Sequence, residues 1–317
     1  MKIVILEPLG IPEKEIKDIG KTLTDNGHEI ISYEDKTDNM DILKKRAEDA
    51  EVLIIANMLL KRELILSCQK LKMISVAFTG VDHVDLDACK EKNITVCNCA
   101  GYSTQAVAEL AIGLMISLMR NIVPLDEKTK ENKTKEGFTQ KEIFGKTLGI
   151  IGTGAIGKKV AEIGAALGCN ILAYNRSEKE DVKKLGAKYV ELDTLLSNSD
   201  IVSVHLPLNN RTRGLISKEK LDLMKPDSIL INTSRGPIVD NKSLAYKLKR
   251  GEIAGAGIDV FDMEPPLPKD YCLLNVPNTV LTPHIGFASE EAMERRAKIA
   301  LANISKWIEG NPQNIII

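Results

Sequence analysis

The sequence lacks the features that mark several large classes of protein. Its 43 lysines and arginines are balanced by 44 aspartates and glutamates, so no basic excess is available to bind a nucleic-acid backbone. No uninterrupted apolar segment approaches the length needed to cross a bilayer, and the apolar run at residues 3–6 is too short for a signal peptide. We therefore expect a cytoplasmic protein with no nucleic-acid partner and no membrane partner. Low-complexity segments and repeats at a solenoid period are also missing.

The six cysteines form no recognisable metal site. The closest pair, Cys97 and Cys99, lacks the second ligand pair that a zinc site requires. The other cysteines are widely spaced and mostly surrounded by apolar residues. We expect free, buried thiols and predict no metal site.

The length of the chain predicts two domains, because 317 residues is long for a single hydrophobic core. Apolar residues make up 44% of the sequence and charged residues 27%, which is ordinary for a globular protein. Short apolar runs, typical of buried strands, alternate with segments of helical apolar spacing in both halves. This alternation predicts an α/β fold in each domain.

The clearest motif is a Gly-x-Gly-x-x-Gly pattern that joins a strand-like run to a helical segment. Gly152 permits a tight turn, Gly154 leaves the backbone open to a pyrophosphate, and Gly157 lets the helix pack closely on the strand. The helix start offers N–H donors to the phosphates. A second strand-like run follows, and this order favours a dinucleotide site over a loop that serves helix packing alone. The residues of the predicted site are Gly152, Gly154, Ala155, Ile156 and Gly157.

The strand-like runs predict two sheets of different size. Six runs with helices between them predict a doubly wound parallel sheet in the second part of the chain, at 148–151, 170–174, 200–204, 228–232, 254–260 and 279–282. Four earlier runs predict a smaller α/β lobe, at 3–6, 52–56, 73–77 and 94–96.

The segments outside these sheets are less uniform. A long, largely apolar helix is predicted over 105–119. The polar, lysine-rich residues 121–143 are interpreted as a solvated arm, with a subunit-contact arm as the alternative. An amphipathic helix capped by Ser289 is predicted over 289–309, and the tail 315–317 could return to the first lobe.

Three predicted strands end in groups that could carry chemistry. These are Arg235 in a Gly-Pro turn, the acids Asp259, Asp262 and Glu264, and His284 between proline and isoleucine-glycine. Ligands of such sheets gather at the carboxyl ends of the strands. An arginine can bind a carboxylate through two parallel hydrogen bonds, and a histidine oriented by a carboxylate can act as a general acid. Together these groups suit the reduction of a 2-oxo acid.

With these motifs the sequence resembles the D-isomer specific 2-hydroxyacid dehydrogenase family over essentially its whole length. The matching segments are 152–157, 205–208, 232–237, 259–265 and 282–286. The resemblance implies two Rossmann-like domains, a dinucleotide-binding domain over 100–286 and a smaller flavodoxin-like substrate domain formed by 1–99 and 287–317. It also implies a homodimer built around 100–145.

The resemblance further implies roles for individual residues. Arg235 would bind the substrate carboxylate and polarise its carbonyl, His284 would donate the proton, and Glu264 would orient His284. The other implied substrate contacts are Asn57, Gly80 and Val81. The other implied cofactor contacts are His205, Pro207, Thr212, Thr233, Asp259 and Gly286.

One departure from the family concerns the cofactor. Eighteen residues after Gly157, where NAD-using relatives place an acid for the ribose 2′-hydroxyl, this chain has Asn175 followed by Arg176 and Ser177. An acid would repel a 2′-phosphate, whereas Asn with Arg can receive one. We therefore expect a nicotinamide cofactor, NAD(P), with NADPH favoured over NADH. The alternative is that Arg176 stacks on adenine or faces solvent while NAD is used.

A second departure concerns the substrate. Phosphoglycerate dehydrogenases of the family carry an Arg-Ser pair where this chain has Asn57-Met58-Leu59. Segments 78–82 and 101–104 are more similar to glycerate dehydrogenases, which are also hydroxypyruvate and glyoxylate reductases. Formate dehydrogenases of the same fold have Gln at the position of Glu264, which argues against formate oxidation.

Two alternative functions stay open at this point. A short D-3-phosphoglycerate dehydrogenase could take its phosphate partner from Lys61 or Arg62. A co-repressor that senses NAD(H) uses the same fold and retains the catalytic trio.

Overall fold

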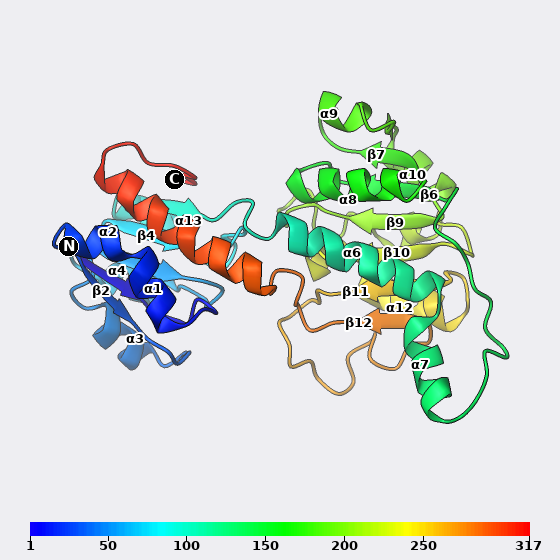
Figure 1. Cartoon of the computed structure of the whole chain (residues 1–317), viewed down its shortest axis with the longest axis horizontal. Coiled ribbons are helices and arrows are strands. Elements are labelled where there is room, and N and C mark those ends of the chain that lie inside the picture. Colours follow the sequence, from blue (N-terminus) through cyan, green and yellow to red (C-terminus); the bar gives the residue numbers. More distant parts are fainter. The chain divides into compact units, whose positions relative to one another are not determined.

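The chain folds into two compact units, and the computed structural model describes all residues from 1 to 317 (Figure 1). Unit 1 comprises Met1–Ser103 and Ala288–Ile317, and unit 2 comprises Thr104–Phe287. The boundaries expected from the sequence were 99/100 and 286/287. Each unit is built on a fully parallel sheet, which confirms the predicted fold class of two Rossmann-like α/β domains.

The sheet of unit 1 has five strands in the order β2-β1-β3-β4-β5, which is the flavodoxin-like order. The strands are β1 (Lys2–Ile5), β2 (Glu29–Ser32), β3 (Val52–Ile55), β4 (Met73–Val76) and β5 (Thr95–Asn98). The four predicted runs correspond to β1, β3, β4 and β5, and β2 is not among those runs. This edge strand has no fully buried residue, so it shows no continuous apolar run.

The helices of unit 1 cover its sheet, and the last of them belongs to the C-terminal segment. They are α1 (Glu13–Ile19), α2 (Lys21–Asp25), α3 (Met40–Ala47), α4 (Arg62–Ser67), α5 (Leu86–Glu91) and α13 (Glu290–Ile308). Ser289 caps α13 by accepting a hydrogen bond from Ala292 N, as predicted. The tail pairs with β5 through Ile316 N and Val96 O at 2.8 Å, which confirms its return to the first lobe.

The sheet of unit 2 has seven strands in the order β12-β11-β10-β9-β6-β7-β8. The strands are β6 (Thr147–Ile151), β7 (Asn170–Tyr174), β8 (Lys188–Tyr189), β9 (Ile201–Val204), β10 (Ile229–Asn232), β11 (Gly255–Ile258) and β12 (Thr279–Leu281). The six predicted strands are present. The sequence missed β8, because a strand of two residues is too short to show a periodic pattern.

Helices cover both faces of this sheet. They are α6 (Thr104–Met119), α7 (Ile122–Lys130), α8 (Ala155–Ala166), α9 (Glu180–Lys183), α10 (Leu192–Asn198), α11 (Lys218–Leu221) and α12 (Asn241–Lys249). Ile229 and Ile231 of β10 join a core with α6 and α8, whereas Leu230 joins a core with α10 and α12. Alternate residues of one strand thus feed two cores, which is why the central strands are apolar throughout.

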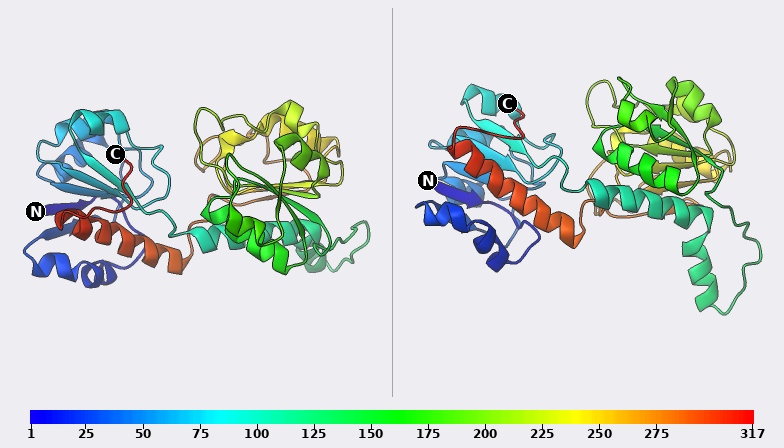
Figure 2. Two further views of the ribbon diagram at one scale, coloured as in Figure 1. Left: turned by 90° about the horizontal axis from the view of Figure 1, so that it is seen from above. Right: turned by 45° about the horizontal axis from the view of Figure 1, so that its top comes forward.

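The polar segment that follows α6 differs from the expectation of a simple solvated arm. Its first part forms α7, and no residue of α7 is buried. Figure 2 shows α7 and the loop after it extending away from the sheet of unit 2. As for membrane insertion, no single helix has both the length and the apolarity to span a bilayer, and α6 with α7 meets that test only as a pair bent by 58°.

All six cysteines are free thiols, as predicted. Cys68, Cys89, Cys97 and Cys99 are buried, and the remaining two are half-buried. Burial raises the pKa of Cys97 to about 11 and that of Cys99 to about 12. These thiols are therefore protonated and unreactive near neutral pH.

Candidate active site

The glycine loop (residues 152–157) has a shape that only glycine permits at two positions. Gly152 has a φ of +97°, and a Cβ there would lie 2.4 Å from the carbonyl oxygen of His205. A Cβ on Gly157 would lie 1.9 Å from the carbonyl oxygen of Gly152. By contrast, nothing lies within 4 Å of the place where a Cβ on Gly154 would stand. The open space is therefore beside Gly154, at the start of α8, where a diphosphate would meet free N–H groups.

A second feature that fits a bound dinucleotide is an unsatisfied hydroxyl. Thr233 follows β10, is 7% exposed, and its Oγ1 has no hydrogen-bond partner within the protein. Buried hydroxyls are rarely left unpaired in native proteins. A ligand at the carboxyl end of β10 would supply the partner, so the residues present suit the cofactor that the glycine loop predicts.

The ribose loop (residues 175–179) follows β7. Asn175 Nδ2 donates to the carbonyl oxygen of Ser177 at 2.7 Å, and Arg176 is exposed. The nearby acid Glu178 is paired with Lys183 at 2.5 Å, and this hydrogen bond is the main reason that the pKa of Lys183 is raised. Lys183 also pairs with Glu180 at 2.9 Å, and Arg176 is an exposed cation of this loop.

The predicted cofactor contacts after β9 are His205, Pro207 and Thr212, and they lie in a loop with internal hydrogen bonds. Thr212 Oγ1 donates to the carbonyl oxygen of Pro207 at 2.6 Å. His205 Nε2 lies 2.8 Å from Ser203 Oγ. Burial lowers the pKa of His205 to about 4, so this imidazole is neutral near pH 7.

His284 and Glu264, predicted to act together, are in direct contact. His284 Nδ1 lies 2.8 Å and 3.0 Å from the two carboxylate oxygens of Glu264. His284 follows β12 and has a left-handed backbone with φ +56°. Its ring and the Phe287 ring form a T-shaped pair with centroids 5.3 Å apart. With Nδ1 held by Glu264, proton transfer to a ligand would use Nε2.

Asp259 holds the loop that carries His284 (the His284 loop, residues 282–286). It is 1% exposed, and its Oδ1 accepts hydrogen bonds from Thr282 Oγ1 at 2.6 Å and Ile285 N at 2.8 Å. Its Oδ2 accepts from Gly286 N at 2.9 Å. Burial raises the pKa of Asp259, and these three hydrogen bonds oppose that rise. The sequence predicted that Asp259 contacts the cofactor, but it did not predict this positioning role. The signal that could have suggested it is an acidic residue directly after a buried strand.

Arg235 follows β10, the neighbour of β11. Its Nη1 donates to the carbonyl oxygen of Ser234 at 2.8 Å, and Asn232 Nδ2 donates to the carbonyl oxygen of Arg235 at 3.0 Å. A Cβ on Gly236 would lie 2.0 Å from backbone atoms of Phe261, so the loops after β10 and β11 touch. Arg235, Glu264 and His284 therefore arise at the carboxyl ends of three adjacent strands.

Asp262, one of the three candidate acids, is used inside the protein. Its Oδ1 accepts from Asn241 Nδ2 at 3.0 Å, and its Oδ2 accepts from the Tyr271 hydroxyl at 2.9 Å. These contacts hold the segment that leads to Glu264. The sequence did not single out Asn241 or Tyr271, and no motif around them signals this contact.

The predicted substrate contacts Asn57, Gly80 and Val81 belong to unit 1, whereas the other predicted site residues belong to unit 2. Asn57 is exposed just after β3, and its Oδ1 accepts a hydrogen bond from Lys36 Nζ at 2.9 Å. The backbone on both sides of Asn57 is held by buried Glu7, whose Oε1 accepts from Ala56 N at 2.7 Å and Met58 N at 2.8 Å.

Comparison with known proteins identifies the family of this chain. Residues 112–286 match the family described as D-isomer specific 2-hydroxyacid dehydrogenase, NAD binding domain. Glycerate dehydrogenase of Methylorubrum extorquens is 37% identical over 91% of this chain and 92% of its own length. Glyoxylate reductase of Thermococcus litoralis is 36% identical over 96% of this chain and 94% of its own length.

Among solved structures, an acyclic imino acid reductase (Bsp5) in complex with NADPH and D-Arg aligns over 100% of both chains with a TM-score of 0.89 and 31% identity. The two relatives match most of the chain, and the family model matches the part that contains the glycine loop and His284. This chain belongs to the D-isomer specific 2-hydroxyacid dehydrogenase family and is a nicotinamide-dependent oxidoreductase acting on D-2-hydroxy acids.

Proposed function

We propose that this enzyme reduces a small 2-oxo acid of the glyoxylate or hydroxypyruvate type to the D-2-hydroxy acid, with Arg235, His284 and Glu264 as its catalytic group. The observation that carries this proposal is the contact of 2.8 Å between His284 Nδ1 and Glu264, on the loops after β12 and β11, next to β10, which Arg235 follows. A nicotinamide cofactor held by the glycine loop would supply the hydride for the C2 carbonyl carbon. Arg235 binds the substrate carboxylate with two parallel hydrogen bonds.

In this proposal His284 delivers the proton that balances the hydride. Protonated Nε2 donates to the carbonyl oxygen as negative charge develops there, which produces the hydroxyl group. Glu264 keeps the ring oriented through Nδ1 and stabilises the imidazolium before transfer. In the direction of oxidation, neutral His284 takes the proton back.

The relatives and the loop after β3 support the proposed substrate class. The relatives named above are a glycerate dehydrogenase and a glyoxylate reductase. In unit 1 the loop after β3 offers Asn57, an uncharged side chain, as a contact for a small polar substrate. Arg62, one candidate phosphate partner, is already ion-paired with Glu91, which favours this class over a phosphoglycerate dehydrogenase.

We propose NADPH as the preferred cofactor. The exposed Arg176 follows Asn175, and the carboxylate of Glu178 is occupied by Lys183. A 2′-phosphate would meet the Arg176 guanidinium there, which can bind it through two parallel hydrogen bonds.

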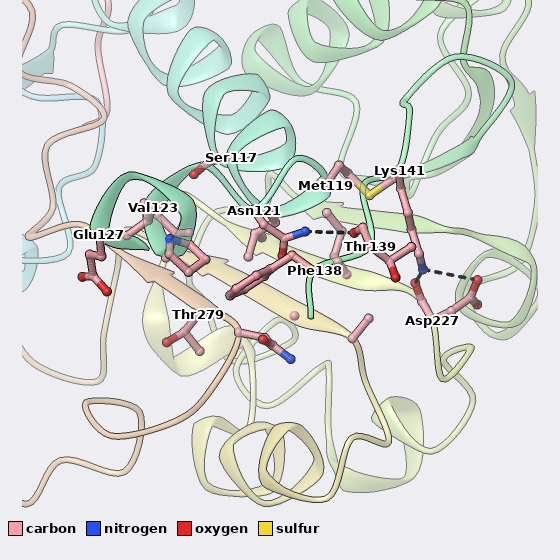
Figure 3. Close-up of a pocket in the computed structure, with 17 residues that line it drawn as sticks. Ser117, Met119, Asn121, Val123, Glu127, Phe138, Thr139, Lys141, Asp227 and Thr279 are labelled. Atoms are coloured by element: carbon pink, nitrogen blue, oxygen red, sulfur yellow. Dashed lines mark hydrogen bonds and ion pairs between the residues drawn. The ribbon is translucent and has the colours of Figure 1, made fainter. Parts of the chain in front are cut away.

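We further propose a homodimer in which the arm (residues 121–143) contacts the second subunit. Ile122 and Val123 of α7 are 49% and 43% exposed, although they begin an otherwise polar helix. Figure 3 shows the pocket beneath the arm, where Val123 and Phe138 face the first residues of β10, β11 and β12. Light scattering should give twice the mass of 34.9 kDa, and Val123→Glu should reduce it to one chain. The cytoplasmic location expected from the sequence stays a prediction.

Initial rates test the proposed reaction. Glyoxylate, hydroxypyruvate, pyruvate and phosphohydroxypyruvate are each compared with NADPH and NADH. We expect the highest kcat/KM for glyoxylate or hydroxypyruvate with NADPH. A maximum for phosphohydroxypyruvate would assign a phosphoglycerate dehydrogenase instead. Absence of turnover with every acid, together with binding of a protein partner controlled by NAD(H), would assign a co-repressor.

A further inference from the structure

A tyrosine at the edge of the sheet of unit 2 connects two loops of the predicted cofactor site. Tyr189 lies in β8, and its hydroxyl donates to Thr153 Oγ1 at 2.8 Å. The same hydroxyl accepts a hydrogen bond from Lys179 N at 3.1 Å. Thr153 belongs to the glycine loop and Lys179 closes the ribose loop, so one side chain joins the two.

The bond to Thr153 restrains the glycine loop. Thr153 stands between Gly152 and Gly154, and glycines leave the backbone more conformational freedom than other residues do. Its side chain is buried at 3% exposure, with the Tyr189 hydroxyl as its hydrogen-bond partner. Removing the tyrosine hydroxyl would leave Thr153 Oγ1 buried without a partner.

The bond to Lys179 restrains the other loop. Asn175 closes the start of the ribose loop on itself by donating to the carbonyl oxygen of Ser177 at 2.7 Å. Lys179 is the residue just before α9, so its N–H has no acceptor in the preceding turn of that helix. Tyr189 supplies this acceptor and fixes the far end of the loop.

We propose that Tyr189 is a positioning residue that sets the spacing between the diphosphate-binding and 2′-phosphate-binding groups and thereby tunes cofactor selectivity. This inference rests on the proposed preference for NADPH through Arg176. Both dinucleotides use the glycine loop, but NADPH alone also carries a phosphate for the ribose loop. A fixed spacing between the loops reduces the entropy cost of binding two phosphate groups at once. Loss of that fixed spacing therefore lowers the affinity for NADPH more than the affinity for NADH.

The test is Tyr189→Phe, which removes the hydroxyl and keeps the ring. Dissociation constants of NADPH and NADH are measured directly by quenching of protein fluorescence, without turnover. We expect the Kd of NADPH to rise about tenfold and that of NADH to rise less than about threefold, since two hydrogen bonds of ordinary strength are lost. The kcat at saturating NADPH should change less than about twofold, because no reacting atom is touched.

Tyr246→Phe serves as the matched control. It is the same substitution in the same unit, at a tyrosine on α12 that is 58% exposed. Both dissociation constants should equal those of the wild-type enzyme. Thr153→Val removes the other partner of the hydrogen bond. It should raise the Kd of NADPH by a similar factor. The double variant should bind NADPH no more weakly than Tyr189→Phe alone does.

The outcomes separate this inference from the proposed function. Wild-type protein that binds neither dinucleotide would overturn the proposed function itself. A different result would overturn only the role of Tyr189. In that case the wild-type protein binds both dinucleotides, and Tyr189→Phe either leaves both dissociation constants unchanged or raises both by the same factor. If Tyr189→Phe does not fold, Thr153→Val carries the same test, and an unchanged ratio of the two constants in that variant is the contradicting result.

Discussion

The glycine loop and the His284 loop are held in shape by opposite means, although both stand at the carboxyl edge of the same sheet. In the glycine loop the shape depends on side chains that are missing, because a Cβ on Gly152 or Gly157 would overlap backbone oxygens. In the His284 loop it depends on a buried side chain, Asp259, that accepts three hydrogen bonds. The cofactor-binding surface here is thus formed by close approach of backbone segments, whereas the reacting side chain is positioned by a buried carboxylate.

The largest expected effect comes from the reacting side chain. His284→Gln should lower kcat by about three orders of magnitude, because it removes the proton donor that the contact with Glu264 orients. The Kd of NADPH should stay within about twofold, since the glycine loop is untouched. Steady-state rates and fluorescence titration measure the two quantities. Retained turnover in this variant would remove His284 from its proposed role.

Alanine substitutions at Gly157 and Gly154 should have different effects on stability and on cofactor binding. Gly157→Ala should destabilise the fold by about 3 kcal/mol or more, because its Cβ would meet the carbonyl oxygen of Gly152 at 1.9 Å. Gly154→Ala has open space around the Cβ and should leave the melting temperature nearly unchanged. It should instead raise the Kd of NADPH about tenfold, because the methyl group stands where the diphosphate approaches. Equal stability loss in both variants would contradict this division.

Asp259→Asn should show that the aim of His284 depends on the carboxylate. An asparagine amide can accept through its oxygen, but its NH₂ group would then face Gly286 N–H, a donor against a donor. We expect kcat to fall about 30-fold with a smaller change in the KM of NADPH. Asp259→Glu, tested beside it, keeps the charge and should not restore activity, because the longer side chain cannot reach the same three donors without strain. A loss confined to cofactor KM would instead make Asp259 a cofactor contact.

The smallest effect is a dependence of stability on pH. The pKa of His205 is lowered to about 4 by burial, from 6.5 for an ordinary histidine. Below pH 6.5 the unfolded chain takes up a proton that the folded chain does not, so the free energy of unfolding falls as the pH drops from 6.5 toward 4. The slope from this one group is at most about 1.4 kcal/mol per pH unit. His205→Asn should remove that part of the slope in urea unfolding at pH 7 and pH 5, and an unchanged slope would show that another group is responsible.

Much of the fold could be predicted because its signals are local. Four of the six predicted strands of unit 2, β6, β9, β10 and β11, are almost wholly buried, and both sheets are parallel as the alternation with helices indicated. The strands that lie outside the predicted runs, β2 and β8, are short and partly exposed and have no periodic apolar pattern. The sequence of the arm is largely polar, and no pattern in it distinguished α7 from a solvated loop.

The candidate site divides in the same way. The glycine loop, Arg235, Glu264 and His284 could be named from residue type and position at strand ends. The supporting contacts could not be named, because Asn241 and Asp262 are 21 residues apart and Tyr189 and Thr153 are 36 residues apart. Contacts over such separations depend on which strands become neighbours.

By itself the sequence determined the two α/β domains, the glycine loop and the residue types at the ends of the strands. These depend on apolar periodicity and on backbone conformations that only certain residues adopt, and both are properties of short segments. The tertiary structure alone decided that Asp259 would clamp the His284 loop and that Tyr189 would reach both cofactor loops. The reason is that hydrogen bonds require atoms within about 3 Å, and only the completed order of the strands brings such distant segments that close.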